Sequence, residues 1–170
     1  AFEQGARGDL SVRAEAGPAD ELGRLASYFN EFMARLEAYG RALRESEERY
    51  RSAMESTPDP IVVYNMQGRV SYCNPAFTRV FGWSLQEIQG DRLHFTPSSQ
   101  ERENDPFLEV VRSQRTVHGM ETVRLTRSGE HRDVIMSGAL FFARADIPAG
   151  MVVSMQDVTA RRRAETALKR

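Results

Sequence analysis

The stretch IVVYNMQGRVSYCNPAFTRVFG, residues 61–82, has the pattern of two short strands followed by a short helix. Its two runs of β-branched and aromatic residues flank the polar segment 65–69, which predicts a hairpin. Asn74 and Pro75 are typical of a helix start, and Gly82 is typical of a helix end. The stretch therefore predicts a domain that opens with two strands and continues with helices.

The residues that follow continue this pattern of short elements. Ser84 is expected to cap a second helix, and Asp105-Pro106 stands at the start of a third one. Two longer strands are expected around the turn 128–130, and a last strand after a loop at 148–150. Two strands, short helices and three strands suit an α+β fold, with helices on one face of an antiparallel sheet. The expected helices are 76–81, 85–89 and 104–114, and the three later strands are 116–126, 131–143 and 151–156.

A long helix is expected upstream, because apolar residues recur at steps of three and four between residue 20 and Pro58. A helix of that length extends over roughly 50 Å at 1.5 Å per residue. Packing on its own domain is one interpretation. The narrow stripe with charged flanks favours a parallel coiled-coil homodimer instead. The expected dimer seam is Leu22, Leu25, Phe29, Phe32, Leu36 and Leu43.

Composition excludes several classes of protein. The formal net charge is -1, and the 23 basic residues are spread along the chain, so no nucleic-acid-binding surface is expected. The sequence has no apolar run near the roughly 18 residues that span a bilayer. Cys73 is the single cysteine, which excludes an internal disulfide. Because the sequence starts at Ala1 without an initiator methionine, we expect it to be part of a longer protein.

Residues 59–159 resemble a PAS domain. The resemblance rests on four motifs in order: Gly68-Arg69-Val70, Asn74-Pro75-Ala76-Phe77, Phe81-Gly82-Trp83-Ser84 and Asp157-Val158-Thr159. In the family, the last motif joins the final strand to an outgoing signalling helix. The resemblance implies a PAS fold, a five-stranded antiparallel sheet with short helices on one face. Asp157 and Thr159 would then form the signal junction, where both could accept hydrogen bonds from the first turn of the outgoing helix.

The N-terminal part is similar to the connector and second helix of a HAMP linker. The similarity rests on Gly8-Asp9-Leu10-Ser11, Asp20-Glu21-Leu22-Gly23 and Phe29-Asn30. Since the first HAMP helix lies outside the sequence, we expect residues 1–19 to be loose or packed in an unphysiological way. The implied domains are a partial HAMP (1–43), a coiled-coil linker helix (44–57), the PAS domain (58–159) and the start of a signalling helix (160–170).

The sequence contains no recognisable catalytic centre. His94 lies in an irregular segment, and His118 and His131 fall in expected strands, so none of them is placed as a phosphoacceptor. Glycine-rich phosphate loops, nucleophile triads and metal-ligand spacings are likewise missing from the sequence. We therefore expect that this chain is not an enzyme and that an output enzyme, a histidine kinase or a cyclic-dinucleotide synthase, lies outside it.

Cofactor binding by the PAS cavity is the remaining chemistry. Light-sensing members bond flavin through a cysteine, but Leu93 stands at the corresponding position, and Met155 replaces the flavin-contacting glutamine. Covalent flavin photochemistry is therefore not expected. Haem-binding members offer a histidine from the helix expected at 104–114, which has none; His118 follows it closely, so haem is disfavoured. Flavin held without a covalent bond stays open, and no metal site is expected.

Alternation along the strands predicts which side chains would line a cavity. These residues could equally fill the core without leaving room for a ligand. Because no charged residue is expected to point inward, such a cavity would suit a small apolar or flat ligand. The candidate lining is Phe107, Val110, Val111, Val123, Leu125, Val134, Met136, Leu140, Phe142, Met151, Val153 and Met155.

Two functional hypotheses follow. In the first, the chain is the sensory and signal-relay module of a two-component-type membrane receptor of the sensor histidine kinase type. It would form a homodimer in the cytoplasmic part of an inner-membrane receptor, and would reach the membrane only through segments N-terminal to this sequence. In the second, it is a ligand-free structural element for dimerisation and relay.

Overall fold

The computed structural model describes residues 9–15, 21–97, 105–144 and 146–168. The chain divides into two compact units, residues 1–53 and residues 54–170. Among the described residues, no helix combines the length and the apolar composition that a bilayer crossing requires.

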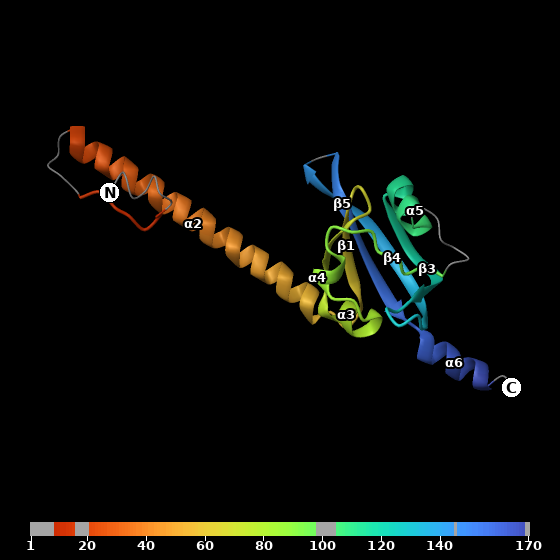
Figure 1. The fold of residues 1–170 in the computed structure, drawn as a ribbon. Helices are drawn as coiled ribbons and strands as arrows, with labels where there is room; N and C mark the ends of the chain where they lie inside the picture. Colours follow the sequence, from red (N-terminus) through yellow and green to blue (C-terminus); the bar gives the residue numbers. More distant parts are fainter. Residues whose placement is uncertain (1–8, 16–20, 98–104, 145, 169–170) are drawn as a thin grey trace. The chain divides into compact units, whose positions relative to one another are not determined.

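The first unit contains most of the long helix α2 (Glu21–Ser56) and a connector that lies along it (Figure 1). Asn30 joins the two elements. Its side-chain oxygen accepts a hydrogen bond from the Ala14 N–H at 2.7 Å, and its amide nitrogen donates to the Ala14 carbonyl at 2.9 Å. The backbone N–H and C=O of one connector residue, Ala14, are thus both satisfied by a single helical side chain.

Residues 1–19 are expected to be loose or packed in an unphysiological way, and the first of these alternatives is wrong for residues 9–15. Leu10 and Val12 are half-buried, and Arg13 forms an ion pair with Glu37 of α2 at 2.8 Å. The reason is that the second HAMP-like helix by itself supplies polar partners for the connector. The remaining part of the range 1–19 lies outside the described residues.

The second unit is built on one five-stranded antiparallel sheet, in the order β2-β1-β5-β4-β3. Its strands are β1 (Ile61–Asn65), β2 (Val70–Cys73), β3 (Thr116–Leu125), β4 (His131–Arg144) and β5 (Ile147–Asp157). The last strand, β5, lies at the centre of the sheet between β1 and β4. The strand that follows α2 and the strand that leads out of the domain are therefore direct neighbours.

Three short helices cover one face of this sheet, and α6 (Thr159–Leu168) leaves its end (Figure 1). The covering helices are α3 (Pro75–Phe81), α4 (Leu85–Ile88) and α5 (Pro106–Gln114). Phe77, Phe81, Phe95 and Phe107 are fully or almost fully buried between them and the strands. The predicted α+β fold is confirmed.

The last strand starts earlier than expected. A loop was predicted at 148–150, but β5 begins at Ile147 and runs through Pro148 and Gly150. Pro148 lies opposite Phe142 where the pairing with β4 is irregular, a position that tolerates a missing N–H. A Cβ at Gly150 would lie 2.3 Å from the Tyr64 carbonyl oxygen, so this glycine permits close strand approach within the sheet.

A β-bulge changes which side chains of β3 face the core. Val117 pairs with Gly138, yet the next pair is Met120 with Met136, so β3 carries one extra residue there. Gly119 lies in that segment with a φ of 67°, a left-handed conformation that suits glycine. A one-residue slip moves every later side chain to the other face. The core-facing residues of β3 after the bulge are therefore Met120, Thr122 and Arg124.

This bulge makes the prediction wrong for Val123 and Leu125, which point to the opposite face of the sheet and are only half-buried. The expectation that no charged residue points inward is wrong for the same reason. Arg124 occupies the inner face, and only 3% of its surface is exposed. The interior of the domain thus contains a guanidinium group that simple alternation had placed outside.

Candidate functional site

Arg124 forms a buried ion pair with Asp105, the residue before α5. One guanidinium nitrogen, Nη2, lies 3.1 Å from Asp105 Oδ1 and 3.2 Å from Oδ2. The other, Nη1, donates to Thr122 Oγ1 and to the Val123 carbonyl. The buried Nε has no hydrogen-bond partner among the described residues. Asp105 also accepts a hydrogen bond from the Phe107 N–H, so one carboxylate caps α5 and ties it to β3.

The ring of Phe95 lies against the guanidinium of this ion pair. The guanidinium carbon of Arg124 lies 5.1 Å from the centre of the Phe95 ring, a cation–π distance. Burial lowers the pKa of Arg124, while the Asp105 carboxylate opposes that effect. Burial raises the pKa of Tyr64, and the Asp105 carboxylate raises it further. The interior thus contains one positive and one negative group beside an aromatic ring, and charges in this environment interact more strongly than in water.

Most of the other predicted cavity residues are brought together in one core. Fully or almost fully buried are Phe107, Val111, Val134, Met136, Met151, Val153 and Met155. Val110 and Leu140 pack against this cluster and are partly buried. Phe142 was expected to face the cavity but is 39% exposed near the β4–β5 turn, where Arg115 lies over its ring at 5.7 Å. The irregular pairing around Phe142 takes it out of the alternation.

Helix α5 lies very close to the sheet. A Cβ added at Gly138 of β4 would lie 2.9 Å from Phe107 Cε1 and 2.9 Å from Val111 Cγ2, closer than real contacts allow. The side chains of α5 therefore occupy the space above Gly138. This close packing favours a filled core in this part of the domain.

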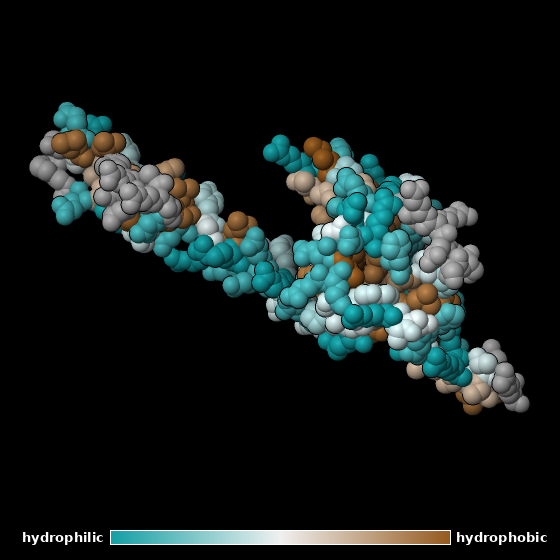
Figure 2. All heavy atoms as spheres, viewed as in Figure 1, coloured by the Kyte–Doolittle hydropathy of each residue, from teal (hydrophilic) through white to brown (hydrophobic). Residues whose placement is uncertain are grey.

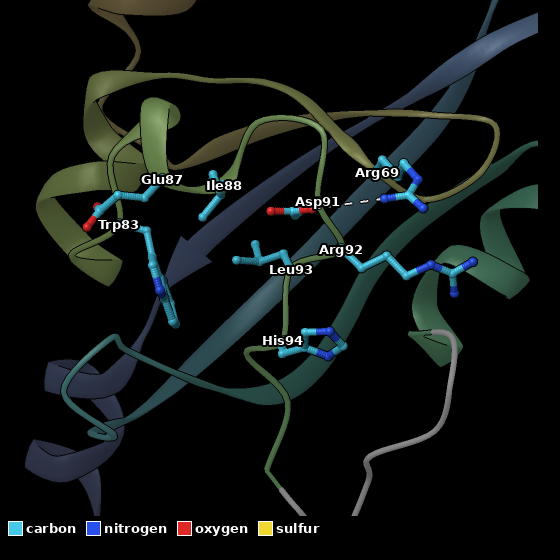
Figure 3. Close-up of a pocket in the computed structure, with 8 residues that line it drawn as sticks. All are labelled: Arg69, Trp83, Glu87, Ile88, Asp91, Arg92, Leu93 and His94. Carbon is cyan, nitrogen blue, oxygen red and sulfur yellow. Dashed lines mark ion pairs between the residues drawn. The ribbon is translucent and has the colours of Figure 1, made fainter.

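A separate pocket of about 470 Å³ opens on the surface beside α4 (Figure 3). Trp83, Ile88 and Leu93 contribute apolar walls, and Arg92 and His94 lie along the same chain segment. Leu93, the residue at the expected flavin-bonding position, is thus a wall of this surface pocket. Trp83 also contacts the buried core, since its ring lies 6.5 Å from that of Phe95.

Asn74 fastens the beginning of the PAS-like unit. Its side-chain oxygen accepts hydrogen bonds from the N–H groups of Ile61 and Phe77, at 2.9 and 3.0 Å. Its amide nitrogen donates to the carbonyls of Met54 and Asp59, at 3.1 and 3.0 Å. One fully buried side chain therefore joins the last turn of α2, the start of β1 and the first turn of α3.

The Asp157–Thr159 junction fastens the other end of the unit. Asp157 Oδ1 accepts a hydrogen bond from the Thr159 N–H at 2.9 Å, at the first residue of α6. The expectation that Thr159 also caps α6 is wrong. Its buried hydroxyl accepts a hydrogen bond from the Asp133 N–H of β4 at 2.9 Å, while the Val158 N–H donates to the Asp133 carbonyl at 2.9 Å. Thr159 thus ties the helix start to the sheet.

Arg162, one turn into α6, adds charged contacts to the same junction. Its guanidinium forms ion pairs with Asp133 of β4, at 3.2 Å, and with Glu121 of β3. These carboxylates belong to neighbouring strands. The start of α6 is therefore held by backbone, hydroxyl and charged contacts to β3 and β4.

The predicted seam residues lie along α2, and most of them are exposed in the single chain. Leu22, Leu25, Phe32 and Leu43 are exposed, while Phe29 and Leu36 are half-covered. Figure 2 shows apolar residues gathered along the first half of α2 and mostly polar ones along the second half. Such an apolar stripe on a long helix is typical of a surface that binds another helix.

Sequence reasoning missed the roles of three residues. Arg124 was hidden by the bulge, for which Gly119 within a strand was the available signal. Asn74 was identified as a helix start, but its contacts to Met54 and Asp59 depend on how the chain folds back. Arg162 is one of three consecutive arginines, and only the structure shows that it forms ion pairs with both Glu121 and Asp133.

Comparison with known proteins agrees with this architecture. Residues 54–163 match the PAS fold family, and residues 1–38 match the HAMP domain family. The chain is 32% identical over 92 residues to the methanogenesis regulatory histidine kinase FilI of Methanothrix harundinacea, covering 54% of this chain and 10% of that protein. It is 23% identical over 163 residues to the sensor histidine kinase TmoS of Ectopseudomonas mendocina, covering 95% of this chain and 17% of that protein.

A solved structure shows the same fold. The PAS domain of a protein from Colwellia psychrerythraea has a TM-score of 0.56 and 18% sequence identity, covering 67% of this chain and 98% of that one. PAS and HAMP are regulatory domains of signal-transduction proteins. The chain spans a small part of the curated relatives it matches. It belongs to the PAS fold family, and its PAS domain is preceded by a HAMP segment.

Proposed function

We propose that this chain is the sensory and signal-relay module of a two-component-type membrane receptor, located on the cytoplasmic side of the inner membrane. The observation that carries the proposal is the Asp157–Thr159 junction. There, the Thr159 hydroxyl at the first residue of α6 and the backbone N–H of Val158 just before it are both hydrogen-bonded to Asp133 of β4. A movement of the sheet would therefore be transmitted to the outgoing helix. Kinase or cyclase chemistry would belong to a domain outside this chain.

Two copies would act together in this proposal. The stripe along α2 would pair with its equivalent in a parallel coiled coil, because a monomer leaves Leu25 and Phe32 in water. The similarity of the chain to parts of two histidine kinases supports this receptor setting. Asn74 would connect the last turn of α2 to the sheet, as Thr159 connects the sheet to α6.

The experiment uses Thr159→Val in the receptor that contains this segment. Valine keeps the shape but removes the hydroxyl that receives the Asp133 N–H. We expect a folded, dimeric receptor whose output per molecule no longer follows the stimulus. Thr166→Val is the matched control, because among the described residues its hydroxyl bonds within α6, to the Arg162 carbonyl. A normal stimulus response from folded Thr159→Val would overturn the proposal.

A ligand-free dimerisation and relay element is the second candidate. The close approach of Phe107 and Val111 to Gly138 favours it, since that part of the interior is already filled. Native mass spectrometry of the purified protein separates the two candidates. A stoichiometric bound small molecule would support the sensory role, and its consistent absence would support the relay-only role.

A further inference from the structure

The buried Arg124 retains unused capacity to bind an anion. A carboxylate usually binds an arginine through two parallel hydrogen bonds to two different nitrogens. Here both oxygens of Asp105 approach the same nitrogen, Nη2, while Nε is buried without a partner among the described residues. Leaving a buried donor unsatisfied is unfavourable. The guanidinium therefore has a free hydrogen-bond donor, Nε, beside the nitrogen that contacts Asp105, in an interior that is otherwise mainly apolar.

We propose that Arg124 is the recognition group for a small carboxylate ligand, which replaces Asp105 at the guanidinium and thereby releases the start of α5. This inference rests on the proposed sensory role and names the ligand class. It departs from the sequence prediction of an apolar ligand, because that prediction assumed an interior without charge.

The surroundings favour a carboxylate with a small apolar body. Asp105 itself shows that a carboxylate fits against this guanidinium. Phe95 provides an aromatic face beside it, on which an apolar group could pack.

Exchange of the carboxylates would change the structure at a defined place. Asp105 is the N-cap of α5, and its contact with Arg124 holds this helix end on β3. Loss of that contact would free the helix start while the apolar contacts of Phe107 and Val111 remain. The same strand, β3, carries Glu121, which pairs with Arg162 of α6. Ligand exchange at Arg124 would thus act on the strand that holds the outgoing helix.

The test is a titration of the whole chain with sodium butyrate and sodium benzoate, at constant ionic strength. Trp83, the single tryptophan, reports binding by fluorescence, since its ring contacts Phe95, which contacts Arg124. We expect a saturable signal and a raised Tm. Butyramide and benzamide, neutral molecules of the same shape, should give neither.

Two variants make the result specific. Asp105→Asn removes the internal competitor and should tighten binding by about tenfold or more. Arg124→Met should abolish binding. Saturable binding that persists in folded Arg124→Met, or no response to either acid in both wild type and Asp105→Asn, would overturn the proposal. If Asp105→Asn does not fold, the wild-type titration with the neutral amides and Arg124→Met still decides. If the chain does not bind carboxylates, the Thr159→Val experiment still tests the proposed relay function independently.

Discussion

Arg124 and Arg132 lie directly opposite each other on β3 and β4, and each holds the carboxylate that precedes a different helix. Asp105, the partner of Arg124, accepts a hydrogen bond from the first turn of α5. Asp157, 3.5 Å from Arg132, accepts one from the first residue of α6. Like charges opposite each other across strands are unfavourable. Each carboxylate therefore offsets the repulsion between the arginines, and the starts of α5 and α6 share one charged cluster.

Asp105→Ala should lower the free energy of unfolding by about 3–5 kcal/mol, because it leaves the buried Arg124 without its counter-charge. The double variant with Arg124→Met should lose less than the sum of the two single changes. Urea unfolding of the wild type, the two single variants and the double variant measures these free energies. Glu109→Ala is the control, since its ion pair with Arg112 is half-exposed and is expected to contribute less than about 1 kcal/mol. Additive losses would show that the two groups do not interact.

Thr159→Val should destabilise the domain by about 1–3 kcal/mol, because the Asp133 N–H loses its acceptor. Asp157→Ala should cost about 1 kcal/mol through the lost cap. Amide hydrogen exchange in the first turn of α6 should become faster in both variants. In the central strand β5, exchange should rise only as far as the loss of global stability requires. Unaltered protection of α6 in Thr159→Val would contradict the role assigned to this hydroxyl.

Asn74→Asp tests the upstream junction. Aspartate keeps the oxygens that receive the Ile61 and Phe77 N–H groups but loses the two donors to the Met54 and Asp59 carbonyls. We expect a loss of about 1–3 kcal/mol or more, since a charge is also buried. Asn65→Asp is the matched control. Its side-chain oxygen receives backbone N–H groups in an exposed turn, so stability by urea unfolding should change little.

Leu25→Asp combined with Phe32→Asp should convert a dimer into monomers, because both residues belong to the apolar stripe of α2. Ala34→Asp with Ala38→Asp adds the same charge to the opposite side of the helix and should leave the dimer intact. Light scattering at tens of micromolar distinguishes the species, and circular dichroism checks the PAS fold. A monomeric wild type under these conditions would refute the coiled-coil prediction.

The purified protein should be colourless. Leu93 and Met155 stand at the positions of the photochemical pair, and α5 contains no histidine for haem. An absorbance spectrum after gel filtration is sufficient to check this. A Soret band, or a flavin spectrum that stays with the protein, would contradict the prediction.

The local elements of the fold could be predicted because they depend on neighbours in the sequence. Asn74-Pro75 and Gly82 bound α3, and Asp105-Pro106 starts α5, since caps and prolines act over one helical turn. The hairpin around residues 65–69 follows from the same short-range chemistry. The apolar stripe of α2 is likewise a property of spacing alone.

The tertiary structure decided the parts of the candidate site that depend on register and on long-range contacts. One extra residue near Gly119 reverses the alternation of β3, so that Arg124 enters the core and Val123 leaves it. Thr159 finds its partner in Asp133, 26 residues earlier in the chain, because β4 lies beside the end of β5. The sequence alone determined which elements form, but not that β5 begins as early as Ile147. Pairing between distant strands determined which side chains meet, because a shift of one residue in register exchanges the two faces of a strand.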